Sequence, residues 1–397
     1  MRTSRGTAAR PQMAAASLAG AAAVVLALAG CAVGPDFKTP AAPVVADAAH
    51  PYTPVPMPAQ TASAPVSGGA AQRLALGQDI PALWWDLFRS QPLDDLVRSA
   101  LTQSPTLASA QAALRQAQAN YEADSGRKLE PSLTGSLGAE REQVSQVASG
   151  IPGGALYNLY NASVNISYNI DAFGATRREL EGLQSAIDYQ RYQVEATYLS
   201  LTTNLVTTAI QEASLRAQLK ATRDVVEVQQ KSLDLVQKQA QLGAIARGIV
   251  LSQQALLAQT RASLPGLEKA LEQTRHQLAV YAGRLPGDPG LPQFDLDTLH
   301  LPEELPVSLP SALVRQRPDV RAAEALLHQA SAQIGVATAN LYPQITLSGS
   351  FGSQALKVDK LFSNGSLAWS AGAGLLQPIF NGGALQASKR AAIAAYD

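Results

Sequence analysis

Residues 160 to 242 change from one regular pattern to another, and few folds accommodate both. From Tyr160 to Asp171 apolar and polar side chains alternate strictly, which predicts a strand with one apolar and one polar face. After Gly174 a helical pattern without proline continues to Leu242, and such a helix would be ~100 Å long. A tilted strand of about ten residues is long enough to cross a bilayer. The sequence therefore predicts a membrane strand that continues into a helix reaching far into water.

The composition argues against several classes of function. The 397 residues have a formal net charge of zero and only 16% are charged, so we expect no nucleic acid partner. The single cysteine, Cys31, excludes an intramolecular disulfide. The four histidines lack ligand spacing, and the sequence shows no Gly-rich phosphate loop and no Ser/His/Asp or Cys/His set. We therefore expect no metal, no cofactor and no enzymatic activity.

Residues 1–30 are typical of a lipoprotein signal peptide. Basic residues precede an apolar stretch that is short for a transmembrane helix of ~20 residues. Its end resembles the lipobox of bacterial lipoproteins, in which the cysteine is acylated: Leu28, Ala29, Gly30 and Cys31. By the same resemblance, Ala32 after the cysteine favours the outer membrane. The alternative is an uncleaved anchor with a chance cysteine. The Pro/Ala-rich residues 31–80 predict an extended tether without chemistry of its own.

Residues 81–297 form the first of two repeats. We expect a helix from Pro105, a β-hairpin over 131–171, a long helix over 174–242 and a return helix over 249–283. Apolar residues seven apart in both long helices predict coiled-coil packing between them. Glu212 is one of four polar residues that interrupt the seam, which we expect to be narrow and partly wet. The Trp84–Trp85 pair predicts packing at a domain edge rather than a ligand box.

Residues 298–397 repeat this plan about 210 residues later. Residues 103–107 match 316–320, where helices begin, and residues 129–133 match 341–345, where helix gives way to strand. An internal duplication follows, with a helix over 318–341, a β-hairpin over 343–380 and the start of a second long helix. We expect two strand-to-helix turns, made by Asp171, Phe173 and Gly174 and by Gly382 and Gly383.

Two hairpins give four strands, and four strands are too few for a membrane barrel. A sheet within a bilayer has to close, because every backbone polar group there needs a partner, and common small barrels have eight strands. The barrel must therefore be shared between chains, although this reasoning does not fix their number. The fold class is an α+β membrane protein.

Motifs over nearly the whole chain resemble the outer-membrane efflux family, the TolC-type trimeric channels, and its lipoprotein branch that serves resistance-nodulation-division pumps. The motifs are CAVGPDF (31–37), WW (84–85), DAFG (171–174), RPDV (317–320), AE (323–324), IG (334–335), YP (342–343) and PIFNGG (378–383). The resemblance implies a homotrimer with a twelve-stranded outer-membrane barrel and a long α-helical periplasmic tunnel. The family's second repeat also has a long and a return helix, whereas this sequence ends at Asp397. We therefore expect a fragment or a truncated product whose gating residues lie in the absent part.

The function expected is a passive exit duct, lipid-anchored in the outer membrane, for small molecules that a periplasmic adaptor and an inner-membrane pump deliver. Candidate contacts with the adaptor lie in the turn between the long helices, where small residues allow close approach: Leu242, Gly243, Ala244 and Arg247. An ordinary helix–helix turn is the alternative there. Rival functions are a type I protein-secretion duct and a non-conducting periplasmic lipoprotein scaffold. The sequence does not identify the cargo, the pump or the adaptor.

Overall fold

The computed structural model describes residues 32–41, 58–65, 68–307 and 316–397. The chain divides into two compact units. Unit 1 takes its described residues from Met1–Pro40, Leu114–Gln190 and Ala322–Asp397, and unit 2 takes them from Ala41–Ala113 and Arg191–Arg321. Each unit therefore contains segments of both sequence repeats.

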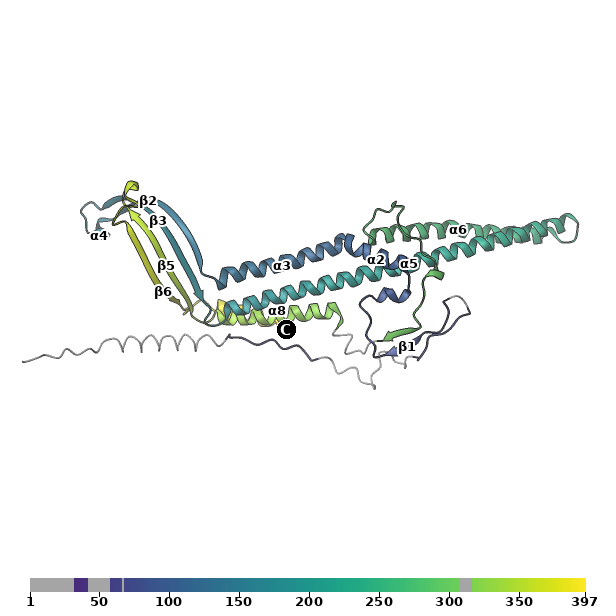
Figure 1. Ribbon diagram of the computed structural model, residues 1–397, viewed down its shortest axis with the longest axis horizontal. Coiled ribbons are helices and arrows are strands. Elements are labelled where there is room, and N and C mark those ends of the chain that lie inside the picture. The colour runs from purple at the N-terminus through teal and green to yellow at the C-terminus, as the bar shows by residue number, and fades with distance from the viewer. Residues whose placement is uncertain (1–31, 42–57, 66–67, 308–315) are drawn as a thin grey trace, which may run out of the picture. The chain divides into compact units, whose positions relative to one another are not determined.

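Unit 1 contains a four-stranded antiparallel sheet (Figure 1). The strands, in their spatial order, are β2 (Ser132–Val144), β3 (Ala155–Ile170), β5 (Gln344–Ala355) and β6 (Leu367–Leu376). A short helix, α4 (Gln146–Ser149), lies between the first two strands, and a 3-10 turn, η3 (Val358–Lys360), lies between the last two. Because β3 pairs with β5, the hairpins of the two repeats form one continuous sheet.

The register of the strands separates an apolar face from a polar face. Val164 lies opposite Phe351, which in turn lies opposite Trp369, and side chains alternate between faces along each strand. The apolar face carries Leu133, Leu137, Ala162, Val164, Ile166, Tyr168, Ile345, Leu347, Phe351, Trp369, Ala371, Ala373 and Leu375. The polar face carries Ser132, Thr134, Ser136, Asn161, Ser163, Asn165, Ser167, Asn169, Thr346, Ser348, Ser350, Gln354 and Ser370. Leu137 is 83% exposed and Trp369 72%, so the apolar face is uncovered in the single chain.

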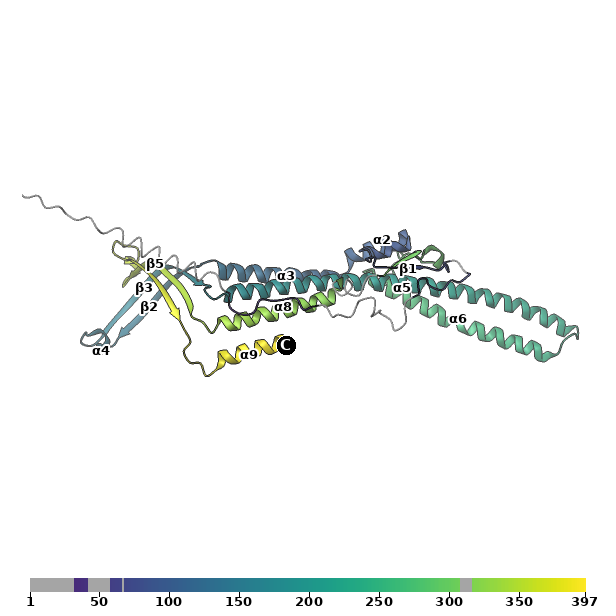
Figure 2. The same cartoon turned by 90° about the horizontal axis from the view of Figure 1, so that it is seen from below.

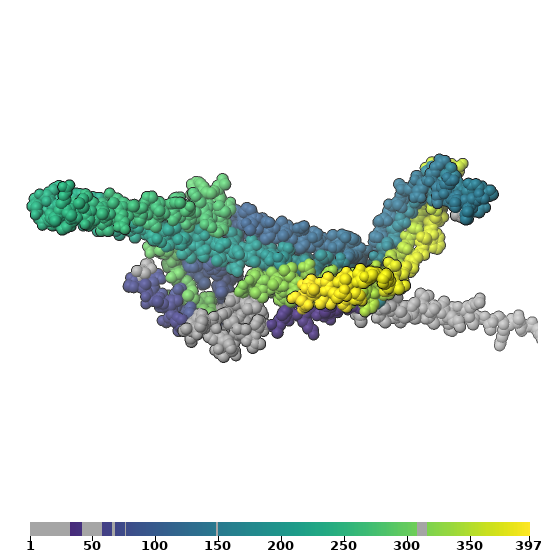
Figure 3. All heavy atoms as spheres, turned by 180° about the vertical axis from the view of Figure 1, so that it is seen from behind, coloured from purple at the N-terminus to yellow at the C-terminus, as the bar shows by residue number. Residues whose placement is uncertain are grey.

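Four helices contribute to unit 1: α3 (Pro105–Leu129), α5 (Ala175–Gln241), α8 (Pro318–Ala339) and α9 (Ala384–Tyr396). The first three also have residues in unit 2. Most of the buried side chains of α8 are alanines, and their small size allows close packing. In Figures 2 and 3 the yellow α9 lies beside the light-green α8, where Ile334 and Ala337 of α8 pack against Ala392 of α9.

Unit 2 is built around a helical core. Short elements, η1 (Trp84–Phe88) and α2 (Gln91–Gln103), contribute to it together with α5 and α6 (Arg247–Tyr281). Trp85 is 1% exposed, and its indole Nε1 donates a hydrogen bond to Asp94 Oδ1 at 3.0 Å. The Arg98 guanidinium, together with this indole N–H, holds the pKa of the Asp94 carboxyl below its usual value. The tryptophan pair therefore packs into the core and forms no open ligand box.

A small parallel sheet completes unit 2. Strand β1 (Arg73–Leu76) pairs with β4 (Glu304–Val307), and a 3-10 turn, η2 (Leu296–Thr298), precedes β4. The pairing differs from the plain extended tether that the sequence predicts up to residue 80. The partner strand, β4, follows α6 in the sequence and is therefore far from β1 along the chain. A local sequence pattern does not predict such a pairing.

Helices α5 and α6 form an antiparallel hairpin (Figure 2). Buried leucines seven or fourteen residues apart line their contact, as the heptad pattern indicates: Leu205, Leu219 and Leu233 of α5 and Leu257, Leu271 and Leu278 of α6. Pro265 lies inside α6. Proline has no N–H to donate, but the helix continues through this position.

Glu212 is where the structure corrects the sequence interpretation. The side chain is fully buried rather than wet. Its Oε1 accepts hydrogen bonds from Arg216, one turn on, and from Arg275 of α6 at 2.8 Å, and its Oε2 accepts one from the backbone N–H of Phe294 at 3.1 Å. Removing one partner from a buried ion pair typically costs about 3–5 kcal/mol. Glu212 therefore links α5, α6 and the chain that follows them.

Candidate functional site

The first strand-to-helix turn is fixed by a carboxylate. Asp171 accepts hydrogen bonds from the backbone N–H groups of Thr176 at 3.1 Å and Arg177 at 3.0 Å, which belong to the first turn of α5, where an α-helix supplies no acceptor of its own. Gly174 has φ +82°, and a Cβ there would lie 2.6 Å from Ala32 Cα. The turn thus requires glycine for its backbone conformation and for the close approach of the N-terminal segment.

That segment, Ala32–Ala41, is called here the strap. The backbone N–H of Val33 donates to the carbonyl of Phe173 at 3.1 Å, and the Phe173 ring stacks on Tyr342 with centroids 4.8 Å apart. Gly34 has φ +100°, and a Cβ there would lie 2.5 Å from Gly335 Cα in α8. The strap therefore contacts the turn and α8 directly. The sequence predicts an extended tether here and does not predict these contacts.

Arg178 of α5 secures the strap. Its side chain is 7% exposed; its Nη2 donates to Asp36 Oδ1 at 2.6 Å and its Nη1 to Glu181 Oε2 at 2.8 Å. Burial opposes the charge of the guanidinium, but the hydrogen bonds to the two carboxylates outweigh it and raise the pKa of Arg178 above its usual value. Glu181 also contacts His328 Nε2 at 2.8 Å, and Phe37 stacks on the His328 ring at 4.3 Å.

The second strand-to-helix turn is built differently. Gly382 and Gly383 have φ of +63° and +83°, and Gly383 occupies the N-cap position of α9 without a side-chain hydrogen bond. Four residues after Gly174 stands Arg178, whereas four residues after Gly383 stands Ala387. The second repeat therefore lacks the cation that holds the strap. Of the two strand-to-helix turns, the first is the one that the described strap residues contact.

The turn between α5 and α6 contains the other predicted site residues. The backbone N–H of Gly243 donates to Ala240 O at 3.1 Å, and that of Ala244 donates to Gln239 O at 2.9 Å, which is the Schellman arrangement of a helix end. Gly243 has φ +73°, so this glycine is required by the helix end itself. Leu242 is 84% exposed, and Arg247 is the first residue of α6. The turn thus presents small and apolar groups to its surroundings.

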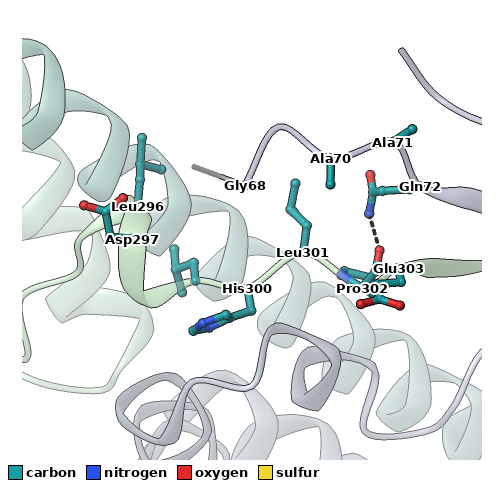
Figure 4. A pocket seen from close by; sticks show the side chains of 11 residues that line it. Gly68, Ala70, Ala71, Gln72, Leu296, Asp297, His300, Leu301, Pro302 and Glu303 are labelled. Carbon is teal, nitrogen blue, oxygen red and sulfur yellow. Dashed lines mark hydrogen bonds between the residues drawn. The ribbon is translucent and has the colours of Figure 1, made fainter. Parts of the chain in front are cut away.

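A cavity of about 170 Å³ lies in unit 2 beside β1 and η2 (Figure 4). Leu301, His300 and Asp297 are among its lining residues. The Gln72 amide donates to the Pro302 carbonyl at 2.7 Å across it, so the hydrogen bond in the cavity joins two segments of the chain. We assign it no chemical role.

Within the described ranges no cluster of three or more His, Cys, Asp or Glu side chains is arranged to hold a metal ion. The same residues include no helix long and apolar enough to cross a membrane. The predicted lipidation site, Cys31, and its lipobox residues Leu28, Ala29 and Gly30 lie outside the described residues.

Comparison with known proteins identifies similar chains. The family described as outer membrane efflux protein matches residues 96–284 and 309–397. The pyoverdine export outer membrane protein OpmQ of Pseudomonas aeruginosa is 34% identical over 325 residues, which are 78% of this chain and 66% of that protein. Nodulation protein T of Rhizobium leguminosarum bv. viciae is 31% identical over 387 residues, 95% of this chain and 73% of that protein. The outer-membrane channel OprN has a TM-score of 0.80 at 29% identity, over 92% of this chain and 78% of that chain. The chain thus spans about two thirds to three quarters of the curated relatives' length.

Replacing Arg178 by alanine is predicted to release the strap. The carboxylate of Asp36 would lose a charge-assisted hydrogen bond, which contributes about 1.5 kcal/mol, so cleavage by trypsin after Lys38 should accelerate roughly tenfold. Arg390→Ala is the matched control, since it removes the same charge from an exposed position in the middle of α9. Equal cleavage rates in the wild type and in Arg178→Ala would show that Arg178 does not hold the strap.

Proposed function

Because the chain belongs to the outer membrane efflux protein family, we propose that it is a channel subunit that forms a passive exit duct for small molecules. The predicted family and TolC-type fold are confirmed by the family match, the curated relatives and the solved channel structure. The family consists of channel proteins, and the chain performs no catalysis of its own in this proposal. The energy for export comes from a partner pump in the inner membrane.

The sheet of unit 1 is the observation that carries the proposal. It has one apolar and one polar face, and its outermost strands, β2 and β6, each have only one neighbouring strand among the described residues. In a bilayer the apolar face meets lipid, and the unpaired edges need partners. Copies of the chain joined edge to edge satisfy both conditions and enclose a polar lumen. Three copies give the twelve strands that the family resemblance implies, so the proposed assembly is a homotrimer.

Helix α5 supplies the proposed route away from the membrane. It is 67 residues long and uninterrupted, which corresponds to ~100 Å at 1.5 Å per residue. Its seam with α6 leaves other apolar side chains uncovered: Val228 is 66% exposed and Leu235 57%. Such residues are suited to packing against further helices of the assembly, as the wall of a helical tunnel requires.

The proposed location is the outer membrane, with a lipid anchor on Cys31. Family membership supports the location in the outer membrane, and the resemblance to a lipobox supports the lipid anchor. The strap adds a structural argument, because Ala32, the residue after Cys31, packs against Gly174 in the turn that follows the C-terminal end of strand β3. An acyl chain attached one residue earlier would then lie near the membrane that the sheet occupies. Signal peptide removal at residue 30 remains part of this proposal.

The α5–α6 turn is the proposed contact with a periplasmic adaptor. Leu242 offers an exposed apolar side chain, and nothing lies within 4 Å of a Cβ built at Gly243, so a partner has open access. The α5–α6 turn is also where the helical hairpin ends, and the family resemblance supports contact there. We propose an adaptor and an inner-membrane pump as partners, and no nucleic acid.

Reconstitution into planar bilayers tests the proposed duct. The intact protein should give discrete ion conductance, because closed copies enclose a continuous polar path. Heat-dissociated protein at the same concentration is the control and should give none. A correctly assembled oligomer that leaves the bilayer non-conducting would instead support a scaffold.

Ala244→Glu is predicted to lower export at least several-fold while the oligomer level stays normal, since it adds charge and bulk at the proposed adaptor contact. Ala244 is a better choice than Gly243, whose positive φ makes any substitution strain the helix end. Val147→Glu, at an exposed site in α4 (97% exposed), is the control and should export normally. Unchanged export of a labelled pump substrate by cells with Ala244→Glu would remove the assignment.

A further inference from the structure

The polar face of the sheet is neutral along most of its length. Its hydroxyl and amide groups bond to one another across neighbouring strands. The Ser136 and Ser163 hydroxyls lie 2.9 Å apart, and the Asn165 amide donates to Ser136 Oγ at 3.2 Å. On the other side of the sheet's centre, the Ser350 and Ser370 hydroxyls lie 2.8 Å apart. This surface offers hydrogen bonds to water and to solutes but presents no fixed charge.

The hydroxyl and amide residues of this face are called the neutral rows. Within the strands, charged groups appear on the same face only where the first hairpin extends beyond them. Glu140 and Glu142 share the face of Ser136, because they follow it at even spacing in β2. They are the only charged residues on the polar face within the four strands. The Tyr157 hydroxyl donates to Glu142 at 2.8 Å and holds its carboxylate at the wall.

Arg141 is a charged residue of the same strand that lies on the opposite face, so it serves as a control for the two glutamates. It lies between the two glutamates in sequence, and the alternation of the strand places it on the opposite face. The cation therefore does not neutralise the carboxylates on the lumenal side. The local excess of negative charge belongs to the polar face alone.

We propose that charge selection along the strands is confined to this hairpin end, where Glu140 and Glu142 favour cationic solutes, while the neutral rows sort solutes by size. The inference rests on the proposed function, since only a conducting duct has a lumen. A fixed charge at a water-filled constriction raises the local concentration of counter-ions. Neutral hydroxyl and amide groups exert no such long-range effect.

The test measures cation-to-anion permeability ratios from reversal potentials of the intact protein in planar bilayers under a KCl gradient. Glu140→Gln with Glu142→Gln should lower the ratio about twofold, the effect of one unit charge ~10 Å from an ion in a water-like dielectric, or by more. Arg141→Gln, which alters the charge of the same stretch of β2 by one unit where the double variant alters it by two, should leave the ratio unchanged. Asn165→Asp, nearly isosteric, should raise the ratio, because it puts charge into the neutral rows.

Conductance and selectivity answer separate questions. Channel openings test the duct, and the ratio among open channels tests this inference. Open channels whose ratio is the same in wild type and in the double glutamate variant would overturn it. A shift of the ratio in Arg141→Gln, equal in size and opposite in sign to that in the double glutamate variant, would also overturn it. Charges on both faces of the sheet would then affect ion permeation.

Discussion

Strands β2 and β6 each leave one row of backbone N–H and C=O groups without a partner strand in the part of the chain that the structure describes, and much of the structure follows from how those groups are satisfied. In water an open edge is a risk of aggregation; in the hydrocarbon of a bilayer each unsatisfied group costs several kcal/mol. The apolar face of the same sheet is suited to that hydrocarbon. A chain with this sheet is therefore incomplete by itself, and a second copy offers the complementary edge, because β2 of one copy can pair with β6 of the next.

The junction between sheet and helix is the second place where geometry is tightly specified. Asp171 satisfies the first N–H groups of α5, Gly174 makes room for the strap, and Arg178 holds Asp36 of the strap. The second repeat makes its strand-to-helix turn with Gly382 and Gly383, without a capping side chain, and has no equivalent of the arginine. The duplication thus supplies two similar hairpins, while the strap distinguishes one turn from the other.

Local pattern predicted the elements of the structure well. Alternation over 160–171 and sevenfold spacing in α5 and α6 depend on residues close in sequence, so the strand, the helices and the turn glycines could be read directly. Glu212 shows where such reading fails. Its neighbour Arg216 is four residues away, but Arg275 is 63 residues away and the Phe294 N–H is 82 residues away, so its burial depends on contacts that no local pattern contains. The position of the strap likewise depends on contacts between residues far apart in sequence, because Gly34 and Gly335 are in contact across about three hundred residues.

The claim that edges of neighbouring copies pair is tested most directly by residue-resolved hydrogen–deuterium exchange of the assembled protein in membranes or detergent. If the sheet closes through neighbouring copies, every amide in the centres of β2 and β6 should be protected as strongly as those of β3 and β5. Dissociation into single chains should expose alternate amides of β2 and β6 alone. Alternate β2 and β6 amides that exchange rapidly in the assembled protein, while β3 and β5 stay protected, would contradict the account.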